Sequence, residues 1–198
     1  MNNFWNERFS SEEYIYGKEP NEFFKKEIEN IKPGKALFLG EGEGRNAVYA
    51  AKLGWDVDAI DSSSAGKDKA LKLAAENDVN INYSVFDLND WDPNLEQYDL
   101  IVIIFLHLLP NIRKKAHDKV VKSLKPVGKL ILQVFDKDQL KFNTGGPKNI
   151  DLLYSLEDVY TDFQDLEIEK FSKETIHINE GEHHKGKAVV INYVGVKN

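Results

Sequence analysis

Three glycines stand at alternate positions in the segment Gly40-Glu-Gly-Glu-Gly44, directly after the apolar run Ala36–Leu39. Glycine has no Cβ, so a loop built from it can turn tightly and lie against a ligand. An aspartate, Asp61, closes the next apolar run and could accept hydrogen bonds from both hydroxyls of a ribose. A strand, a glycine loop, a helix and an acid about 20 residues on predict an adenosine-containing cofactor at the edge of a parallel sheet.

The spacing of the glycines distinguishes between two classes of cofactor. A dinucleotide fingerprint has glycine at its first, third and sixth positions, but the sixth position counted from Gly40 is Arg45. An arginine there would obstruct the close packing of helix on strand that glycine permits. The third glycine, Gly44, stands at the fifth position instead, which resembles the loop of class I S-adenosylmethionine-dependent methyltransferases. A nicotinamide-dependent oxidoreductase is the alternative.

Hydrophobic periodicity predicts the elements that position this loop. Strands are expected at 36–39, 57–60, 81–86, 98–106 and 130–135, and helices at 46–53, 64–77 and 110–124. A polar loop at 136–149 and a helix at 151–163 follow. Two alternating runs, 166–178 and 187–196, are joined by a segment typical of a β-hairpin. The order predicts an α/β fold, a doubly wound, mostly parallel seven-stranded sheet with one antiparallel strand.

Composition limits the class of protein. The formal net charge of −7 and the pI near 5.3 disfavour nucleic acid and membrane surfaces as partners, because neither polyanion attracts an acidic surface. The absence of cysteine excludes disulfides and thiolate catalysis, and we expect no metal site. No stretch approaches the roughly 20 apolar residues of a membrane helix, and the first residues lack the apolar core of a signal peptide. We expect a soluble, cytoplasmic protein, monomeric or homodimeric, with one domain over 1–198.

Further blocks of sequence resemble the tellurite-resistance and thiopurine branch of the class I methyltransferases. These blocks are Trp5–Arg8, Tyr16–Asn21, Phe38–Ala47, Leu106–Pro110 and Thr144–Pro147. The resemblance implies that the cofactor is S-adenosyl-L-methionine and that the methyl acceptor is a small-molecule nucleophile such as a thiol or an oxyanion. The residues expected to bind the cofactor are Tyr16, Gly40, Glu41, Gly42, Gly44, Arg45, Asp61, Ser62, Asp87, Leu88 and Phe105. By the same resemblance, the glycines line the methionine and ribose, Asp61 takes the ribose hydroxyls, Asp87 accepts from the adenine amino group, and Leu88 offers backbone to the ring.

The glycine loop departs from the family pattern in its acids. Many members have an acid two residues before the first glycine, where this chain has Phe38. Glu41, inside the loop, is the candidate to hold the methionine amine, with a solvated loop carboxylate as the alternative. Glu43 is expected to be structural or solvated. A positive charge at a helix start opposes the helix dipole, so Arg45 is expected to pair with Glu41, Glu43 or the cofactor carboxylate.

Three histidines and two tyrosines stand where loops should meet the site. His107 follows the long fourth strand and is the candidate catalytic base. Alternatively it only shapes the pocket, since alignment and desolvation can drive methyl transfer without a base. His183 and His184 are expected in a solvated turn, with a contact at the pocket rim as the alternative. Tyr14 and Tyr16 are expected to act as a lid.

The first 33 residues are expected to form a helical and aromatic lid segment, in which Trp5 and Phe9 pack a helix on the core. No catalytic dyad is obvious in the sequence. A binding or regulatory module that keeps the cofactor pocket without transferring a methyl group is therefore a further alternative.

Overall fold

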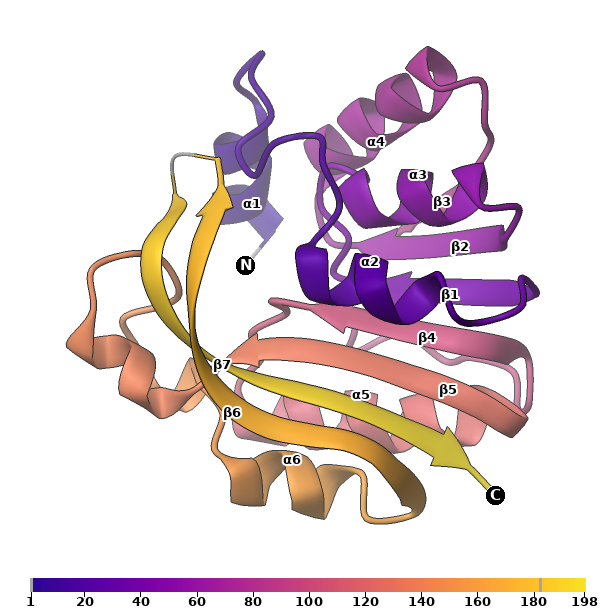
Figure 1. Ribbon diagram of the computed structural model, residues 1–198. Helices are drawn as coiled ribbons and strands as arrows, with labels where there is room; N and C mark the ends of the chain where they lie inside the picture. Colours follow the sequence, from indigo (N-terminus) through magenta and orange to yellow (C-terminus); the bar gives the residue numbers. More distant parts are fainter. Residues whose placement is uncertain (1, 182) are drawn as a thin grey trace.

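A seven-stranded sheet forms the centre of the computed structural model, which describes residues 2–181 and 183–198 (Figure 1). In the order β3-β2-β1-β4-β5-β7-β6, the strands are β1 (Lys35–Leu39), β2 (Asp56–Asp61), β3 (Asn82–Val85), β4 (Tyr98–Ile104), β5 (Leu124–Phe135), β6 (Leu166–Glu180) and β7 (His184–Lys197). β7 runs antiparallel to both of its neighbours, and the remaining pairs are parallel. The predicted mostly parallel sheet with one antiparallel strand is confirmed.

Helices cover both faces of the sheet. They are α1 (Asn2–Phe9), α2 (Glu22–Ile28), α3 (Arg45–Lys52), α4 (Ser64–Glu76), α5 (Pro110–Ser123) and α6 (Leu156–Asp162), with short 3-10 helices η1 (Lys137–Lys141) and η2 (Ile150–Leu152). One core cluster joins α2, α3 and α4 to one face, and a second joins α5 and α6 to the other. β4 lies between the two clusters, which explains its almost continuous apolar sequence.

Two predicted boundaries are wrong for local reasons. The helix expected over 151–163 is divided into η2 and α6, because Ser155 and Asp158 form a capping box that starts α6 at Leu156. β5 starts at Leu124 rather than at 130. The residues between form an irregularity in the pairing of β4 with β5, where Val127 has a positive φ of 59°.

The N-terminal helix packs on the start of α4, as Figure 1 shows. The Oδ1 of Asn6 accepts hydrogen bonds from the Ser63 hydroxyl and the Ala65 N–H. Phe9 is buried and lies against Gly42 and Gly66. The expected packing of this helix through Phe9 is confirmed, whereas Trp5 is half-buried and lines the cavity described below. The packing brings α1 to the glycine loop.

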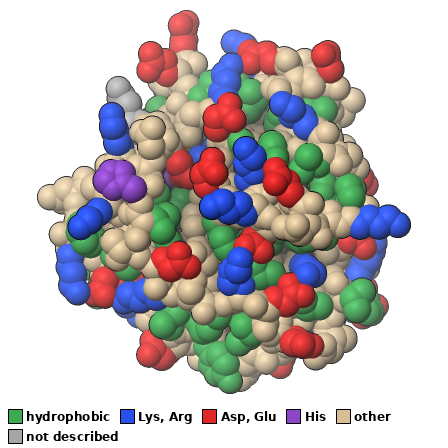
Figure 2. All heavy atoms as spheres, viewed as in Figure 1, with side chains coloured by type: hydrophobic (Ala, Val, Ile, Leu, Met, Phe, Trp, Pro, Cys, Tyr) green, Lys and Arg blue, Asp and Glu red, His purple; other side chains and the backbone are tan. Residues whose placement is uncertain are grey.

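On the face drawn in Figure 2, acidic and basic side chains are interspersed and no large basic patch forms. Within the described part of the chain, no helix has the length and apolar character needed to span a membrane.

Candidate functional site

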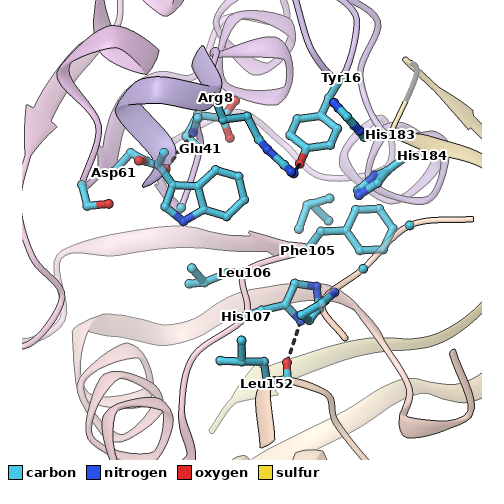
Figure 3. Close-up of a pocket in the computed structure, with 18 of the residues that line it drawn as sticks. Arg8, Tyr16, Glu41, Asp61, Phe105, Leu106, His107, Leu152, His183 and His184 are labelled. Atoms are coloured by element: carbon cyan, nitrogen blue, oxygen red, sulfur yellow. Dashed lines mark hydrogen bonds between the residues drawn. The ribbon is translucent and has the colours of Figure 1, made fainter. Parts of the chain in front are cut away.

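A cavity of about 700 Å³ opens where β1, β2, β3 and β4 end. The carboxyl edge of a parallel sheet is where ligands bind in such folds. Other walls of the cavity come from α1, the segment around Tyr16, residues 143–148 and the hairpin residues 183–185. In Figure 3, Asp61 and Glu41 lie at one side of the cavity, and Phe105 and His184 lie at the other. The cavity therefore has a glycine-loop side and a hairpin side.

Gly40 and Gly42 form part of the cavity wall. Their φ angles are +68° and +62°, a region that side chains with a Cβ rarely adopt. A Cβ on Gly40 would lie 2.6 Å from the Leu106 Cδ1, and one on Gly42 would lie 3.1 Å from the Phe9 Cζ. The loop thus presents bare backbone to the cavity, as expected for a surface that holds a nucleoside.

Gly44 does not line the cavity, contrary to expectation. A Cβ there would lie 2.6 Å from the Cβ of Ala70 in α4. The residue precedes α3 as its N-cap, so its small size allows α3 and α4 to approach each other. Its role in this structure is helix packing.

Asp61 ends β2 with its side chain held by backbone donors. The Gly42 N–H donates to Oδ2 at 3.0 Å, and the Ser63 N–H donates to Oδ1 at 2.9 Å. Burial raises the pKa of the carboxyl group. A carboxylate offers about four lone-pair sites, so acceptor capacity is left for ligand hydroxyls. Asp61 and Ser62 both line the cavity.

Asp87 and Leu88 line the cavity beyond β3. The Asp87 Oδ1 accepts hydrogen bonds from the backbone and side-chain nitrogens of Asn89, at 2.9 and 2.8 Å. These bonds fix the turn that follows the strand. Phe86 beside it is 49% exposed, so this end of the cavity offers an aromatic face next to a hydrogen-bond acceptor.

Glu41 is buried, which excludes the solvated alternative. Its Oε1 accepts from the N–H groups of Asn46 and Ala47, at 2.9 and 2.8 Å. The carboxyl group therefore caps the start of α3 while it lines the cavity. Desolvation raises its pKa to about 7, partly offset by the hydrogen bonds and by Arg45.

Glu43 is structural, one of its two expected roles. Its side chain is 2% exposed and pairs with Lys69 at 2.7 Å. It also accepts from the N–H groups of Ile15 and Tyr16, at 3.2 and 3.4 Å. The second acid of the glycine loop thus fastens the N-terminal segment to the site.

Arg45 pairs with neither of the two expected glutamates. Its Nη2 donates to the Oε2 of Glu180, the last residue of β6, at 2.8 Å. Its Nη1 donates to the Tyr16 carbonyl at 3.4 Å. Burial alone would raise the pKa of Glu180, but bonds from His184 and the Arg45 guanidinium lower it to about 2. Glu180 takes the place of Glu41 and Glu43 because the hairpin reaches across the sheet to α3, and a contact of Arg45 with the cofactor carboxylate stays a prediction.

His184 is also placed differently from the expected solvated turn. It is 7% exposed, and its Nδ1 lies 3.4 Å from the Glu180 Oε2. Its ring lies 4.5 Å from that of Tyr16 and 5.0 Å from that of Phe105, between centroids. His183 is exposed and contributes to the cavity rim. The sequence contains one signal for this contact: Glu180 and His184 stand on either side of Gly181.

Only one of the two expected lid tyrosines lines the cavity. The Tyr16 hydroxyl accepts from the Arg8 NH1 at 3.2 Å, and its ring faces the cavity in Figure 3. The Tyr14 hydroxyl instead donates to the Lys69 carbonyl at 3.0 Å.

Phe105 lines the cavity with a φ of +53°, a strained backbone for a bulky residue.

His107 lines the cavity on the side of β4 (Figure 3). Its Nδ1 lies 2.8 Å from the Leu152 carbonyl oxygen, and its ring stacks on Phe135 with 5.5 Å between centroids. Burial lowers its pKa to about 4. The candidate base is therefore a neutral imidazole.

Comparison with known families agrees with this geometry. The family model described as "Tellurite resistance protein TehB" matches residues 5–194. The chain belongs to the TehB family. This match confirms the family inferred from the sequence. TehB proteins of Haemophilus influenzae carry the name "Probable S-adenosyl-L-methionine-dependent methyltransferase", in agreement with the inferred cofactor.

The sequence similarity to individual TehB proteins and other methyltransferases is local. The "Probable S-adenosyl-L-methionine-dependent methyltransferase TehB" of Haemophilus influenzae Rd is 30% identical over 97 residues, 48% of this chain and 32% of that protein. The ubiquinone biosynthesis O-methyltransferase of Rickettsia bellii OSU 85-389 is 26% identical over 125 residues, 63% of this chain and 51% of that protein. The aligned regions thus span about a third and a half of these relatives.

Solved structures show that the TehB-family chain has the Rossmann-like methyltransferase fold. The crystal structure of TehB from Haemophilus influenzae superposes with a TM-score of 0.76 at 17% identity, over 99% of this chain and 66% of that chain. A structure titled "Conversion of a Disulfide Bond into a Thioacetal Group during Echinomycin Biosynthesis" gives 0.79 at 13% identity, over 98% and 88%. At these identities the likeness concerns the fold alone.

Proposed function

We propose that this TehB-family chain transfers the methyl group of S-adenosyl-L-methionine to a small-molecule nucleophile. The proposal rests on one observation: Gly40 and Gly42 form part of the cavity wall with backbone alone. The N–H of Gly42 donates a hydrogen bond to the Asp61 carboxylate, which therefore lies beside this backbone surface. A Cβ at Gly40 would collide with Leu106, and one at Gly42 would crowd Phe9. The arrangement supports a ligand that combines a flat nucleoside with two adjacent hydroxyls.

Each end of the cofactor has a candidate partner at the glycine-loop side. Gly40 and Gly42 would contact its methionine and ribose portions, and Asp61 would accept from the ribose hydroxyls. Asp87 would accept from the adenine amino group, with the Leu88 backbone beside the ring. The carboxylate of Glu41, buried against the start of α3, would hold the cationic amine. When bound, the cofactor supplies a methyl group on a positively charged sulfur.

The hairpin side would then receive the acceptor. Tyr16, Phe105, His107 and His184 form this part of the wall, and their rings exclude water from the point of transfer. A cavity of about 700 Å³ that would also hold the cofactor supports a small acceptor rather than a polymer, in agreement with the acidic net charge of −7.

Calorimetry with S-adenosylhomocysteine tests the proposal. We expect binding in the micromolar range by the wild-type chain and loss of detectable binding in Asp61→Ala. Asp68→Ala is the matched control, because Asp68 is exposed on α4 away from the cavity. Circular dichroism verifies that each variant is folded. No binding by the folded wild-type chain, or thermal stabilisation by NADH alone, would contradict the proposal.

Turnover separates an enzyme from a module that only binds the cofactor. Labelled S-adenosylmethionine is incubated with a panel of thiols, phenols, amines and oxyanions of selenium and tellurium. We expect labelled methyl product from at least one class. Tight S-adenosylhomocysteine binding with no transfer to any class would favour the binding module.

A further inference from the structure

The loop that leaves β4 has a strained backbone and contacts the glycine loop. Phe105, the first residue after β4, has a φ of +53°, which costs free energy in a bulky residue and persists only where the surrounding structure holds it. Leu106 follows, and its Cδ1 would lie 2.6 Å from a Cβ on Gly40. Residues 105–107, the exit loop of β4, thus form a wall of the cavity whose backbone needs support from outside.

Two hydrogen bonds from one short segment support the exit loop. The Tyr154 hydroxyl donates to the Leu106 carbonyl at 3.0 Å. The Nδ1 of His107 lies 2.8 Å from the Leu152 carbonyl oxygen (Figure 3), and it carries the hydrogen because a carbonyl only accepts. Two neighbouring residues of the exit loop are therefore bonded to two alternate residues of the segment 152–154.

The segment 152–154 is itself fixed by the core. The Tyr154 side chain is fully buried. Its backbone N–H donates to the Phe135 carbonyl at 3.1 Å, and its carbonyl accepts from the Lys137 N–H at 2.8 Å. The guanidinium of Arg113 lies 4.9 Å from the centre of the Tyr154 ring. The exit loop is therefore bonded to a support that has little freedom to move.

The second nitrogen of His107 makes no bond of this kind. Within residues 2–181 and 183–198, its Nε2 is buried and has no hydrogen-bond partner. A general base must come within hydrogen-bond reach of the proton that it removes, whereas this atom is buried in the wall, where the ring stacks on Phe135. The unpaired Nε2 costs free energy, which the bond from Nδ1 to Leu152 partly offsets. The geometry thus supports the alternative in which His107 shapes the pocket.

We propose that His107 and Tyr154 are positioning residues, which hold the exit loop against the glycine loop and so align the methyl group with its acceptor. The inference rests on the proposed function, which assigns Gly40 to the methionine portion of the cofactor. Both residues act through the backbone of the exit loop. The inference needs no proton transfer to His107, and it leaves the class of acceptor open.

Alignment is a large part of the rate of methyl transfer. The methyl carbon forms its bond to the acceptor as its bond to the sulfonium sulfur breaks, and a displacement of about 1 Å can lower the rate about 100-fold. Leu106 lies beside Gly40, where the methionine portion is proposed to bind, whereas Asp61 and Asp87 are proposed to hold the adenosine portion. A loosened exit loop should therefore lower kcat much more than it lowers cofactor affinity.

Amide substitutions at His107 separate positioning from proton transfer. The amide nitrogen of asparagine is as many bonds from the backbone as Nδ1 and can donate to Leu152, whereas that of glutamine corresponds to Nε2. The assay uses labelled S-adenosylmethionine and the acceptor of the panel above that the wild type methylates fastest. We expect His107→Asn to keep most of the wild-type kcat and His107→Gln to lose about 100-fold, both at unchanged S-adenosylhomocysteine affinity. Equal losses in the two variants would overturn the inference, because neither amide is a base.

Tyr154→Phe removes only the hydroxyl group that makes the second bond. We expect kcat to fall about 10- to 100-fold at unchanged S-adenosylhomocysteine affinity. Tyr160→Phe is the matched control, because Tyr160 is 55% exposed on α6 and lies outside the cavity. Urea unfolding verifies that each variant is folded. Full activity of Tyr154→Phe would overturn the inference.

Methyl NMR reports on the exit loop without turnover. The ¹³C-methyl signals of Leu106, identified by their absence in Leu106→Ile, are compared in the free chain and in the S-adenosylhomocysteine complex. We expect them to shift in His107→Gln and Tyr154→Phe and to stay in place in His107→Asn and Tyr160→Phe. Unmoved signals in the first two variants would overturn the inference. Failure of the wild type to bind S-adenosylhomocysteine would instead refute the proposed function, while the signals of the free chain would still test the support of the loop.

Discussion

The guanidinium of Arg45 lies 2.8 Å from the carboxylate of Glu180, although 135 positions separate the two residues in the sequence. The bond joins the first residue of α3, next to the glycine loop, to the last residue of β6. Asn21 also donates to Glu180, at 2.9 Å. One largely buried carboxylate, with 13% of its side chain exposed, thus connects the N-terminal segment, the glycine loop and the hairpin.

Removing this carboxylate should destabilise the fold. Glu180→Ala leaves a buried guanidinium without its counter-charge, and we expect a loss of about 3–5 kcal/mol in the free energy of unfolding, measured by urea denaturation. Asp118→Ala is the control, because Asp118 pairs with Lys114 on the exposed face of α5 and should cost less than about 1 kcal/mol. Equal effects in the two variants would contradict a connecting role for Glu180.

Alanine substitutions at Gly44 and Gly54 separate the cost of a steric clash from the cost of backbone strain. Both have a φ of +90°, but only a Cβ at Gly44 would collide, with Ala70 of α4. We therefore expect Gly44→Ala to be less stable than Gly54→Ala by about 1–3 kcal/mol, the usual cost of overpacking. Thermal or urea unfolding checks the difference. Two variants of the same stability would show that α3 and α4 move apart without cost.

The stability of the chain should fall as pH rises, in part through Glu41. Burial raises the pKa of its carboxyl group from 4.5 to about 7 in the folded chain, so folding favours the protonated form. This contribution is complete below pH 4.5 and is lost as pH rises through 7. Glu41→Gln keeps an oxygen that can cap α3 and should show a smaller decrease in urea midpoint between pH 5 and pH 8. Parallel pH profiles would argue against a raised pKa.

Glu41 should also raise the affinity for ligands that carry an amine over ligands that lack one. If its carboxylate holds the cationic amine of the cofactor, binding of S-adenosylhomocysteine strengthens as pH rises from 6 to 8, because the carboxyl group must ionise. We expect Glu41→Gln to weaken this binding about tenfold and to remove its pH dependence. 5′-Methylthioadenosine, which lacks the amino acid portion, is the control ligand and should bind both proteins equally. Unchanged affinity for S-adenosylhomocysteine would limit Glu41 to capping α3.

The glycine-loop side of the site could be predicted because it is encoded locally. A strand, a glycine loop and a helix start follow one another from Lys35 to Lys52, and Asp61 ends the next strand. The alternation of strands and helices along the chain predicted the doubly wound sheet, and the hairpin pattern of the last two strands predicted its single antiparallel strand. Connections between parallel strands are short and right-handed, so a sequence with this order of elements has few other possible folds.

The hairpin side could not be predicted because it depends on long-range register. The partner of Arg45 and the burial of His184 follow from where β6 and β7 end, and β7 pairs with β5 across the sheet. The position of Gly44 outside the cavity wall could not be predicted for a related reason. Glycine spacing suits both ligand contact and close helix packing, and only the position of Ala70 in three dimensions decides between them.

The hairpin also meets the N-terminal loop, since a Cβ on Gly181 would collide with the carbonyl oxygen of Ile15. The segment around Tyr16 and the hairpin therefore close the cavity together with Phe105 and His107, opposite the glycine loop. In evolutionary terms, the segments around Tyr16 and His184 can diverge toward new acceptors while the segment from Lys35 to Asp61 continues to encode the proposed cofactor site. A hybrid that joins this segment to the hairpin of another family member should exchange substrate and retain cofactor.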